Sequence, residues 1–263
     1  RGSYAKSTLA SLESFVAKSR GCYKRIDTVI APSRFMADKL AEGGVPAEKI
    51  NVLHNFANPA LLEHARDPRG KDNSLDRYFL FFGRLSREKG VKVLIDAYAS
   101  IRDSIPRGMR LVIVGDGPER RSLESLVSDL NLSDHVVFAG YQTGEALTRY
   151  IESASFVVVS SQCRENYPYS IVEAFACGTP VVGTRMGGIP ELVTEGETGY
   201  LCESGSSASL GESMVRAAST PADAYKAMQG RCRRYVLEEC TKERYLRSLM
   251  SVYELAAQHR RGC

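Results

Sequence analysis

Short apolar runs alternate with amphipathic helical patterns through most of the chain. The runs are continuous, as strands buried on both faces should be. They cover residues 79–82, 111–114, 136–138, 156–159 and 181–182. Spacings of three and four residues between the runs predict helices with one apolar face. One such face holds Val91, Leu94, Ile95, Tyr98 and Ile101, and another holds Leu123, Leu126, Val127 and Leu130. The alternation predicts an α/β fold with a Rossmann-like, doubly wound parallel sheet.

The first 56 residues form a separate piece with its own pattern. Residues 26–31 and 50–54 are expected to be strands, joined by a helix that Ser33 caps and that Gly43-Gly44 ends. A further helix is expected around residues 8–18. One strand–helix–strand unit is smaller than a typical domain of roughly 100 residues, so it is interpreted as part of a second Rossmann-like domain.

The remaining segments divide by composition. Residues 57–76 are polar, contain Pro59, Pro68 and Gly70, and are interpreted as a linker. Residues 77–240 carry the repeated strands and helices and form the main domain. Residues 241–263 are expected to hold a C-terminal helix, with Tyr245, Leu249 and Tyr253 facing one way.

Composition excludes several classes of protein. The net charge of +4 over 263 residues is too small for a dedicated nucleic-acid binder. Seven cysteines, an odd number without Cys-x-x-Cys spacing, argue against a disulfide framework or a zinc cluster. No apolar run approaches the roughly 20 residues of a membrane span. A cytoplasmic protein with free thiols is therefore expected.

Almost every predicted strand ends in a small residue. These residues are Gly83, Gly115, Gly140, Ser160 with Ser161, and Gly183. In doubly wound sheets, ligands bind at the carboxyl ends of the strands. The loops that follow these residues are therefore where the chemistry is expected.

The segment 164–182 is the most informative of these loops. Pro168 suits the first turn of a helix, whose amides from Tyr169 to Ile171 would form an anion site. Glu165 precedes that helix, and Glu173 lies about a turn and a half into it. Two ionised carboxylates can accept hydrogen bonds from the hydroxyls of a polyol. On spacing alone, Glu173 can equally be an ordinary solvated helix residue, although its neighbours Val172 and Ala174 are apolar.

A second loop, residues 82–90, carries Arg84 and Lys89 directly after a strand. Arginine can bind a phosphate through two parallel hydrogen bonds, and lysine adds a compact charge. The loop can therefore stabilise a departing diphosphate. The alternative, a basic surface turn, is common in proteins.

Two further loops are rich in glycine. Gly115 and Gly117 lie in one of them, and Gly187 and Gly188 lie in the other. Glycine permits close approach of the backbone to a ligand. Both loops can also be purely structural turns.

Taken in order, these segments resemble the family 4 (group 1) glycosyltransferases, which have the GT-B fold. The resemblance runs from about residue 26 to about residue 200 and includes 27–33, 138–140 and 199–201. There are three departures. Tyr167-Pro168 stands where many members have Phe-Gly, and His54-Asn55-Phe56 stands where Asn-Gly is usual. The resemblance also implies that about 100 residues of the N-terminal, acceptor-binding domain are absent.

The resemblance implies a retaining hexosyltransferase whose C-terminal domain binds a UDP- or GDP-sugar without a metal or other cofactor. It implies that Arg84 and Lys89 hold the diphosphate, that Glu165 contacts the transferred sugar, and that Glu173 contacts the ribose. The implied donor-binding residues are Gly83, Gly115, Gly117, Tyr141, Asn166, Tyr167, Pro168, Tyr169, Ser170 and Glu173. The acceptor would be a glycan or a lipid-linked glycan.

Other readings of the same residues stay open. The chain can be a nucleotide-sugar-binding module that is inactive without the missing acceptor residues. Nonhydrolysing nucleotide-sugar epimerases share the GT-B architecture, but they have a Ser-Gly-Gly turn where this chain has Ser160-Ser161-Gln162. The first 25 residues have six basic residues against Glu13, which suits either peripheral contact with the inner membrane face or an ordinary solvated surface. No nucleic-acid partner is expected, and the oligomeric state is not indicated.

Overall fold

The computed structural model describes residues 26–66 and 77–261, and the side chains of these residues up to 258. The chain divides into two compact units, Phe56–Lys242 and a smaller unit formed by Arg1–Asn55 with Glu243–Cys263. The helix expected around residues 8–18 and the basic residues of the first 25 lie outside the described residues.

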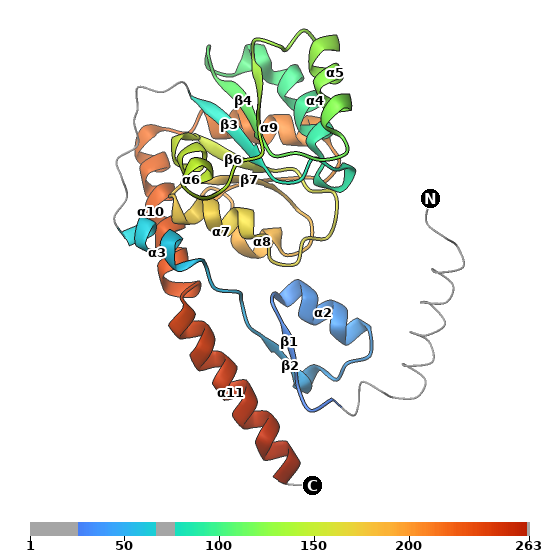
Figure 1. Ribbon diagram of the computed structural model, residues 1–263, viewed down its shortest axis with the longest axis vertical. Coiled ribbons are helices and arrows are strands. Elements are labelled where there is room, and N and C mark those ends of the chain that lie inside the picture. Colours follow the sequence, from blue (N-terminus) through green and yellow to red (C-terminus); the bar gives the residue numbers. More distant parts are fainter. Residues whose placement is uncertain (1–25, 67–76, 262–263) are drawn as a thin grey trace, which may run out of the picture. The chain divides into compact units, whose positions relative to one another are not determined.

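The larger unit is built on a parallel sheet of six strands in the order β5-β4-β3-β6-β7-β8 (Figure 1). The strands are β3 (Tyr78–Phe82), β4 (Arg110–Val114), β5 (Val136–Gly140), β6 (Phe156–Val159), β7 (Val181–Thr184) and β8 (Gly199–Cys202). The α/β prediction and its five strands are confirmed, and β8 is an additional strand. The order reverses between β3 and β6, so the carboxyl ends of these two strands form the switch point of the sheet.

Helices cover both faces of this sheet. On one face lie α4 (Val91–Ile101), α5 (Arg120–Asp129) and α9 (Ser207–Ala218). The other face is covered by α3 (Pro59–Arg66), α6 (Gly144–Ser153) and α7 (Tyr169–Ala176). The long helix α10 (Ala222–Glu239) packs against α7 and α3. The unit also contains three short helical turns, η3 (Arg87–Lys89), η4 (Arg102–Ser104) and α8 (Ile189–Leu192).

Alternate strand residues supply the two cores. In β6, Phe156 and Val158 join the cluster under α4 and α9, whereas Val157 and Val159 join the cluster under α7. All four side chains are at most 6% exposed. Because both faces of β6 are buried, its apolar sequence is continuous. The expectation of burial on both faces was wrong for β5, which lies at the edge of the sheet and leaves Val137 39% exposed.

Part of the predicted linker is a helix. Residues 59–66 form α3, whose Leu62 and Ala65 are buried. The helix contacts α10 and α7, and the amide of Ala57 donates to the carbonyl of Cys240 over 2.8 Å. The interpretation of the whole stretch as a linker was wrong here because the apolar face of α3 has only two buried residues within a polar sequence.

The smaller unit has a two-stranded parallel sheet of β1 (Val29–Ala31) and β2 (Ile50–Val52), with α2 (Arg34–Glu42) between them. A 3-10 turn, η2 (Ala47–Lys49), leads into β2. The hydroxyl of Ser33 accepts from the amide of Met36 over 3.2 Å, so the predicted cap is confirmed. The strands are shorter than predicted.

The C-terminal helix, α11 (Lys242–Arg261), extends to nearly the end of the chain. Among its residues up to 258, Val252 is buried at 6% exposure, whereas Tyr253 is 58% exposed. The prediction that Tyr253 lies on the same face as Tyr245 and Leu249 is therefore wrong. A helix turns by ~100° per residue, so residue 252 points to within about 20° of the direction of Tyr245, whereas residue 253 points away from it. None of the described helices has the length and apolar character needed to cross a membrane.

Candidate functional site

Two loops are fastened together at the switch point of the sheet. The loop after β3 contains η3 with Lys89, and the loop after β6 begins with Ser160. The hydroxyl of Ser160 donates to the carbonyl of Lys89 over 2.9 Å, and the amide of Gln162 donates to the carbonyl of Glu88 over 2.7 Å. Gly90 has a φ of +68°, and a Cβ there would collide with the carbonyl oxygen of Ser160. The close approach of the two loops therefore requires glycine at this position.

The fastened loops bring Lys89 and Glu165 into direct contact. Lys89 Nζ lies 2.5 Å from Glu165 Oε1. Ser161 Oγ donates to the same oxygen over 2.7 Å, and Cys163 Sγ lies 3.8 Å from it. The Glu165 side chain is 15% exposed and that of Lys89 is 32% exposed. A cation and a carboxylate from two separate sequence motifs thus form one cluster at the carboxyl ends of β3 and β6.

Arg84 lies exposed on the same loop as Lys89. Beside it, a hydrogen bond of 2.7 Å from the Ser86 hydroxyl lowers the pKa of Glu88, and the positive charges of Arg84 and Lys89 lower it further. Glu88 is therefore a fixed negative charge of this loop. Arg84 remains accessible to an anionic ligand.

The glycines after β4 lie against the backbone of the loop after β3 and do not border open space. A Cβ on Gly115 would collide with the carbonyl of Gly83, and one on Gly117 would collide with the backbone of Leu85. The amide of Leu85 donates to the carbonyl of Asp116 over 2.9 Å. These glycines therefore allow two strand-end loops to pack closely.

The loop after β7 supports Glu165 from the other side. The amide of Gly188 donates to the carbonyl of Glu165 over 2.7 Å. Gly187 has a φ of +61°, and a Cβ there would collide with the same carbonyl. The sequence suggested close approach to a ligand at these glycines, but the group they approach is the backbone of Glu165.

The start of α7 differs in part from the expected anion site. Pro168 caps the helix, and the amide of Ile171 donates to the Pro168 carbonyl over 3.1 Å. The Ile171 amide is thus occupied, contrary to the prediction. The Tyr167 ring is 6% exposed, and its hydroxyl lies 3.3 Å from Cys240 Sγ. Burial raises the pKa of Tyr167 strongly, so its side chain belongs to the core.

The other predicted donor-binding residues differ in exposure. Tyr169 is 52% exposed, and Asn166 and Ser170 are half-buried. Tyr141 directly follows β5 and is 75% exposed. The structure thus leaves these residues accessible from solvent, in contrast to Tyr167.

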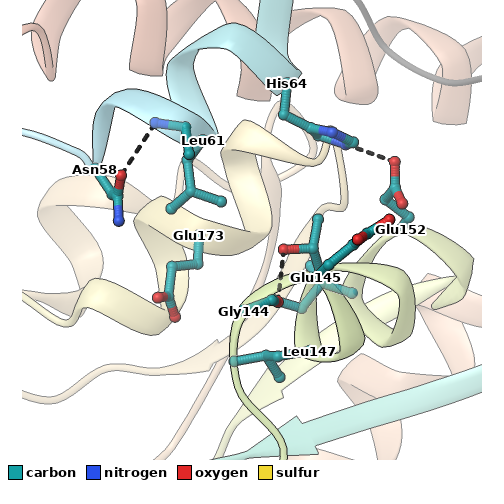
Figure 2. Close-up of a pocket in the computed structure, with 11 residues that line it drawn as sticks. Asn58, Leu61, His64, Gly144, Glu145, Leu147, Glu152 and Glu173 are labelled. Atoms are coloured by element: carbon teal, nitrogen blue, oxygen red, sulfur yellow. Dashed lines mark hydrogen bonds and ion pairs between the residues drawn. The ribbon is translucent and has the colours of Figure 1, made fainter.

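Glu173 projects from α7 into a separate pocket of about 360 Å³ (Figure 2). Its wall is formed by α7 together with residues of α3 and α6, among them Leu61, His64 and Leu147. Glu173 is half-buried and its neighbours Val172 and Ala174 are fully buried. Burial raises the pKa of Glu173. No described residue donates a hydrogen bond to its carboxylate, and its partial burial between apolar neighbours distinguishes it from a fully solvated helix residue.

A close contact between a histidine and a glutamate lies on the far side of this pocket. His64 Nε2 lies 2.5 Å from Glu152 Oε1, and both side chains are at most 16% exposed. The contact joins α3 to α6. Sequence patterns did not indicate this pair, because the two residues are far apart in the chain.

Two family models match the chain. Residues 66–234 match the model described as glycosyl transferases group 1, and residues 3–61 match the model described as glycosyltransferase family 4. Together they cover most of the chain in the order that the resemblance implied.

Individual relatives are similar over parts of their own length. N-acetyl-alpha-D-glucosaminyl L-malate synthase of Bacillus anthracis is 27% identical over 232 residues, 86% of this chain and 59% of that protein. D-inositol 3-phosphate glycosyltransferase of Pseudarthrobacter chlorophenolicus is 36% identical over 148 residues, 55% of this chain and 35% of that protein. The chain therefore spans less than two-thirds of the length of these curated relatives.

Solved structures show the same fold. Sucrose-phosphate synthase from Thermosynechococcus elongatus has a TM-score of 0.75 at 26% identity, over 94% of this chain and 61% of that one. Anabaena Alr3699/HepE in complex with UDP and glucose has a TM-score of 0.72 at 23% identity, over 94% of this chain and 66% of that one. The predicted fold class is confirmed by these neighbours.

Proposed function

The chain belongs to the group 1 glycosyltransferases, and from this premise we propose that it binds the sugar-nucleotide donor of a sugar-transfer reaction. The donor is proposed to be a UDP- or GDP-sugar. The acceptor is proposed to be a glycan or a lipid-linked glycan, and the transfer to retain the configuration at the anomeric carbon.

The observation that carries this proposal is the contact between Lys89 and Glu165 at the switch point. A nucleotide sugar has an anionic diphosphate joined to a hydroxyl-rich ring. A lysine suits the diphosphate, and a carboxylate suits the hydroxyls, because an ionised carboxylate only accepts hydrogen bonds. Both groups lie together, at the edge of the sheet where doubly wound folds bind ligands.

Stabilisation of the leaving diphosphate is the proposed source of catalysis. As the bond between the sugar and the diphosphate breaks, negative charge accumulates on the diphosphate. Lys89 and the exposed Arg84 supply fixed positive charge for it, and we propose that no bound metal is needed. Such preorganised charge is usually the largest single contribution to rate enhancement.

Glu173 supports a nucleoside subsite beside the diphosphate. Its half-buried carboxylate has no donor among the described residues, and burial raises its pKa. A ligand that brings hydroxyl groups, such as the ribose of a nucleotide, would satisfy it. The adjoining pocket of about 360 Å³ has room for part of such a ligand.

A second candidate function is donor binding without transfer. The contact between Lys89 and Glu165 is assigned to the donor, and no described residue is assigned to an acceptor. The alternative is therefore a nucleotide-sugar-binding module without activity of its own.

A thermal-shift screen against UDP-, GDP- and ADP-sugars tests the proposal. A ligand at a hundred times its dissociation constant stabilises the folded state by about 2.7 kcal/mol. We expect one base to raise the melting temperature. If no sugar nucleotide does so at millimolar concentration, donor binding is wrong. Incubation of the stabilising donor with a panel of glycan acceptors then separates the transferase, which forms product, from the binding module, which does not.

A further inference from the structure

We propose that Ser161 is the positioning residue of the donor site, which turns the Glu165 carboxylate so that Oε1 binds Lys89 and Oε2 is kept for a sugar hydroxyl. This inference rests on the proposed function. It begins from an asymmetry in how the described residues bind Glu165.

Among the described residues, every donor to the Glu165 carboxylate reaches the same oxygen. Lys89 Nζ, Ser161 Oγ and Cys163 Sγ lie 2.5, 2.7 and 3.8 Å from Oε1. An ionised carboxylate has about four acceptor sites, two on each oxygen. No described residue donates to Oε2, which is also not among the buried side-chain atoms that lack a partner. Oε2 is therefore open to solvent and free to accept from a ligand.

Of the three donors, the hydroxyl of Ser161 is the one held most firmly. Ser161 is 2% exposed. Its carbonyl accepts from Thr184 Oγ1 over 2.9 Å and from Ser204 Oγ over 3.2 Å. These bonds tie Ser161 to the end of β7 and to the loop after β8. Its hydroxyl thus approaches Glu165 from a fixed point.

The other two donors cannot fix the carboxylate in the same way. Lys89 has a long, flexible side chain that is 32% exposed, and a thiol such as that of Cys163 is a weak donor. The Lys89 ammonium has three protons and can bind Glu165 and a diphosphate at once. When a diphosphate draws Lys89 outward, only Ser161 keeps Oε1 in place. Oε2 then stays directed at the sugar.

The proposal predicts a defect that is specific for the sugar. In Ser161→Ala the Glu165 carboxylate can rotate together with Lys89. The contact between Glu165 and the sugar hydroxyl is then weakened, while the contact between Lys89 and the diphosphate remains. With the sugar nucleotide that gives the largest thermal shift, we expect an affinity loss of about tenfold, the size of one hydrogen bond to a charged group. Affinity for its free nucleoside diphosphate should change by less than about twofold.

The matched control is Ser213→Ala. Ser213 is 3% exposed and its hydroxyl donates one bond, to the carbonyl of Leu201 over 3.1 Å. This substitution removes a buried hydroxyl of the same kind in α9 and should leave both affinities unchanged. If Ser161→Ala does not fold, Ser161→Cys keeps a weak donor of similar size and should give an intermediate loss for the sugar nucleotide alone.

The affinities of deoxy donors distinguish a positioning role of Ser161 from a purely structural one. Titration calorimetry is done with donors that lack one sugar hydroxyl each, against the wild type and Ser161→Ala. One deoxy donor will bind the wild type most weakly. In Ser161→Ala, the difference in affinity between the full donor and this deoxy donor should largely disappear, because the missing hydroxyl and the positioned oxygen are coupled.

The outcomes separate the two claims. If Ser161→Ala weakens the free diphosphate and the sugar nucleotide equally, or keeps the full deoxy penalty, the positioning role is overturned and donor binding stands. If the wild type binds no sugar nucleotide, the proposed function fails and the positioning role fails with it.

Discussion

Glu165 and Glu173 lie eight residues apart in one loop and helix, yet their surroundings are opposite. Glu165 is 15% exposed and bonded to Lys89 and Ser161. Glu173 is half-buried in α7, has no donor among the described residues, and has a raised pKa because of burial. The difference is that described side chains hold one oxygen of Glu165 in place, whereas no described residue donates to the carboxylate of Glu173.

The same contrast is visible in the elements that carry them. The loop of Glu165 is pressed between the loops after β3 and β7, where Gly90 and Gly187 allow close contact. Glu173 instead projects from a regular helix into a pocket beside α3 and α6 (Figure 2). We therefore expect mutations around Glu165 to disturb both structure and function, and mutations of Glu173 to separate the two.

The largest expected effect is that of Lys89→Ala. It removes the charge assigned to the diphosphate and leaves Glu165 without its cation. We expect the rate of sugar transfer to fall on the order of 10²–10³-fold. The measurement is kcat/KM for donor consumption in the presence of an acceptor. Lys92→Ala, which removes an exposed lysine of α4 that pairs with Asp96, is the control, and near-normal turnover in Lys89→Ala would rule out the diphosphate role.

A smaller effect is expected from Gly187→Ala, which tests the support of Glu165. Gly187 and Gly196 have φ values of +61° and +74°, a region that costs a residue with a Cβ about 1–2 kcal/mol. At Gly187 the Cβ would also collide with the carbonyl of Glu165, whereas nothing lies within 4 Å of it at Gly196. Gly187→Ala should therefore lower the free energy of unfolding and the donor affinity more than Gly196→Ala. Equal losses on chemical denaturation would contradict the close packing of this loop.

The smallest expected effect is a pH-dependent gain in stability from Glu173→Gln. Burial raises the pKa of Glu173 above its ordinary value of 4.5, so the unfolded chain ionises first as the pH rises. The carboxyl therefore lowers stability progressively from the unfolded pKa up to the folded pKa, and by a constant amount above it. Glu173→Gln should melt at a higher temperature than the wild type at pH 7, and the difference should vanish near pH 4, about the unfolded pKa of glutamate.

Glu212→Gln is the control for the change in net charge, because Glu212 is an exposed residue of α9. It should not reproduce the gain in melting temperature. A gain of equal size in both variants, or a gain for Glu173→Gln that persists at pH 4, would show that burial of the Glu173 carboxylate is not the cause.

The strands buried on both faces could be predicted from sequence, because their apolar runs are continuous. β8 was missed because Gly199–Cys202 opens with glycine, which is uncommon in strand interiors. α3 was missed because only Leu62 and Ala65 of its eight residues are buried. The true face of α11 could not be identified, because the difference between Val252 and Tyr253 depends on the tertiary packing.

The loops of the candidate site could also be predicted, because parallel strands place their carboxyl ends at one edge. The contact between Lys89 and Glu165 could not, since it depends on β3 lying beside β6, which is a non-local property. Ser161 resembled any small residue at the end of a strand. Its role follows only from the direction of its hydroxyl.

The most direct test of the account is titration calorimetry of Glu165→Gln and Glu173→Gln with a free nucleoside diphosphate and with the matching sugar nucleotide. The account predicts that Glu173→Gln weakens both ligands by a similar factor of about ten, the loss of one hydrogen bond to a charged group. It predicts that Glu165→Gln weakens the sugar nucleotide alone. Equal weakening of both ligands by Glu165→Gln, or unchanged affinity for the free diphosphate in Glu173→Gln, would contradict it.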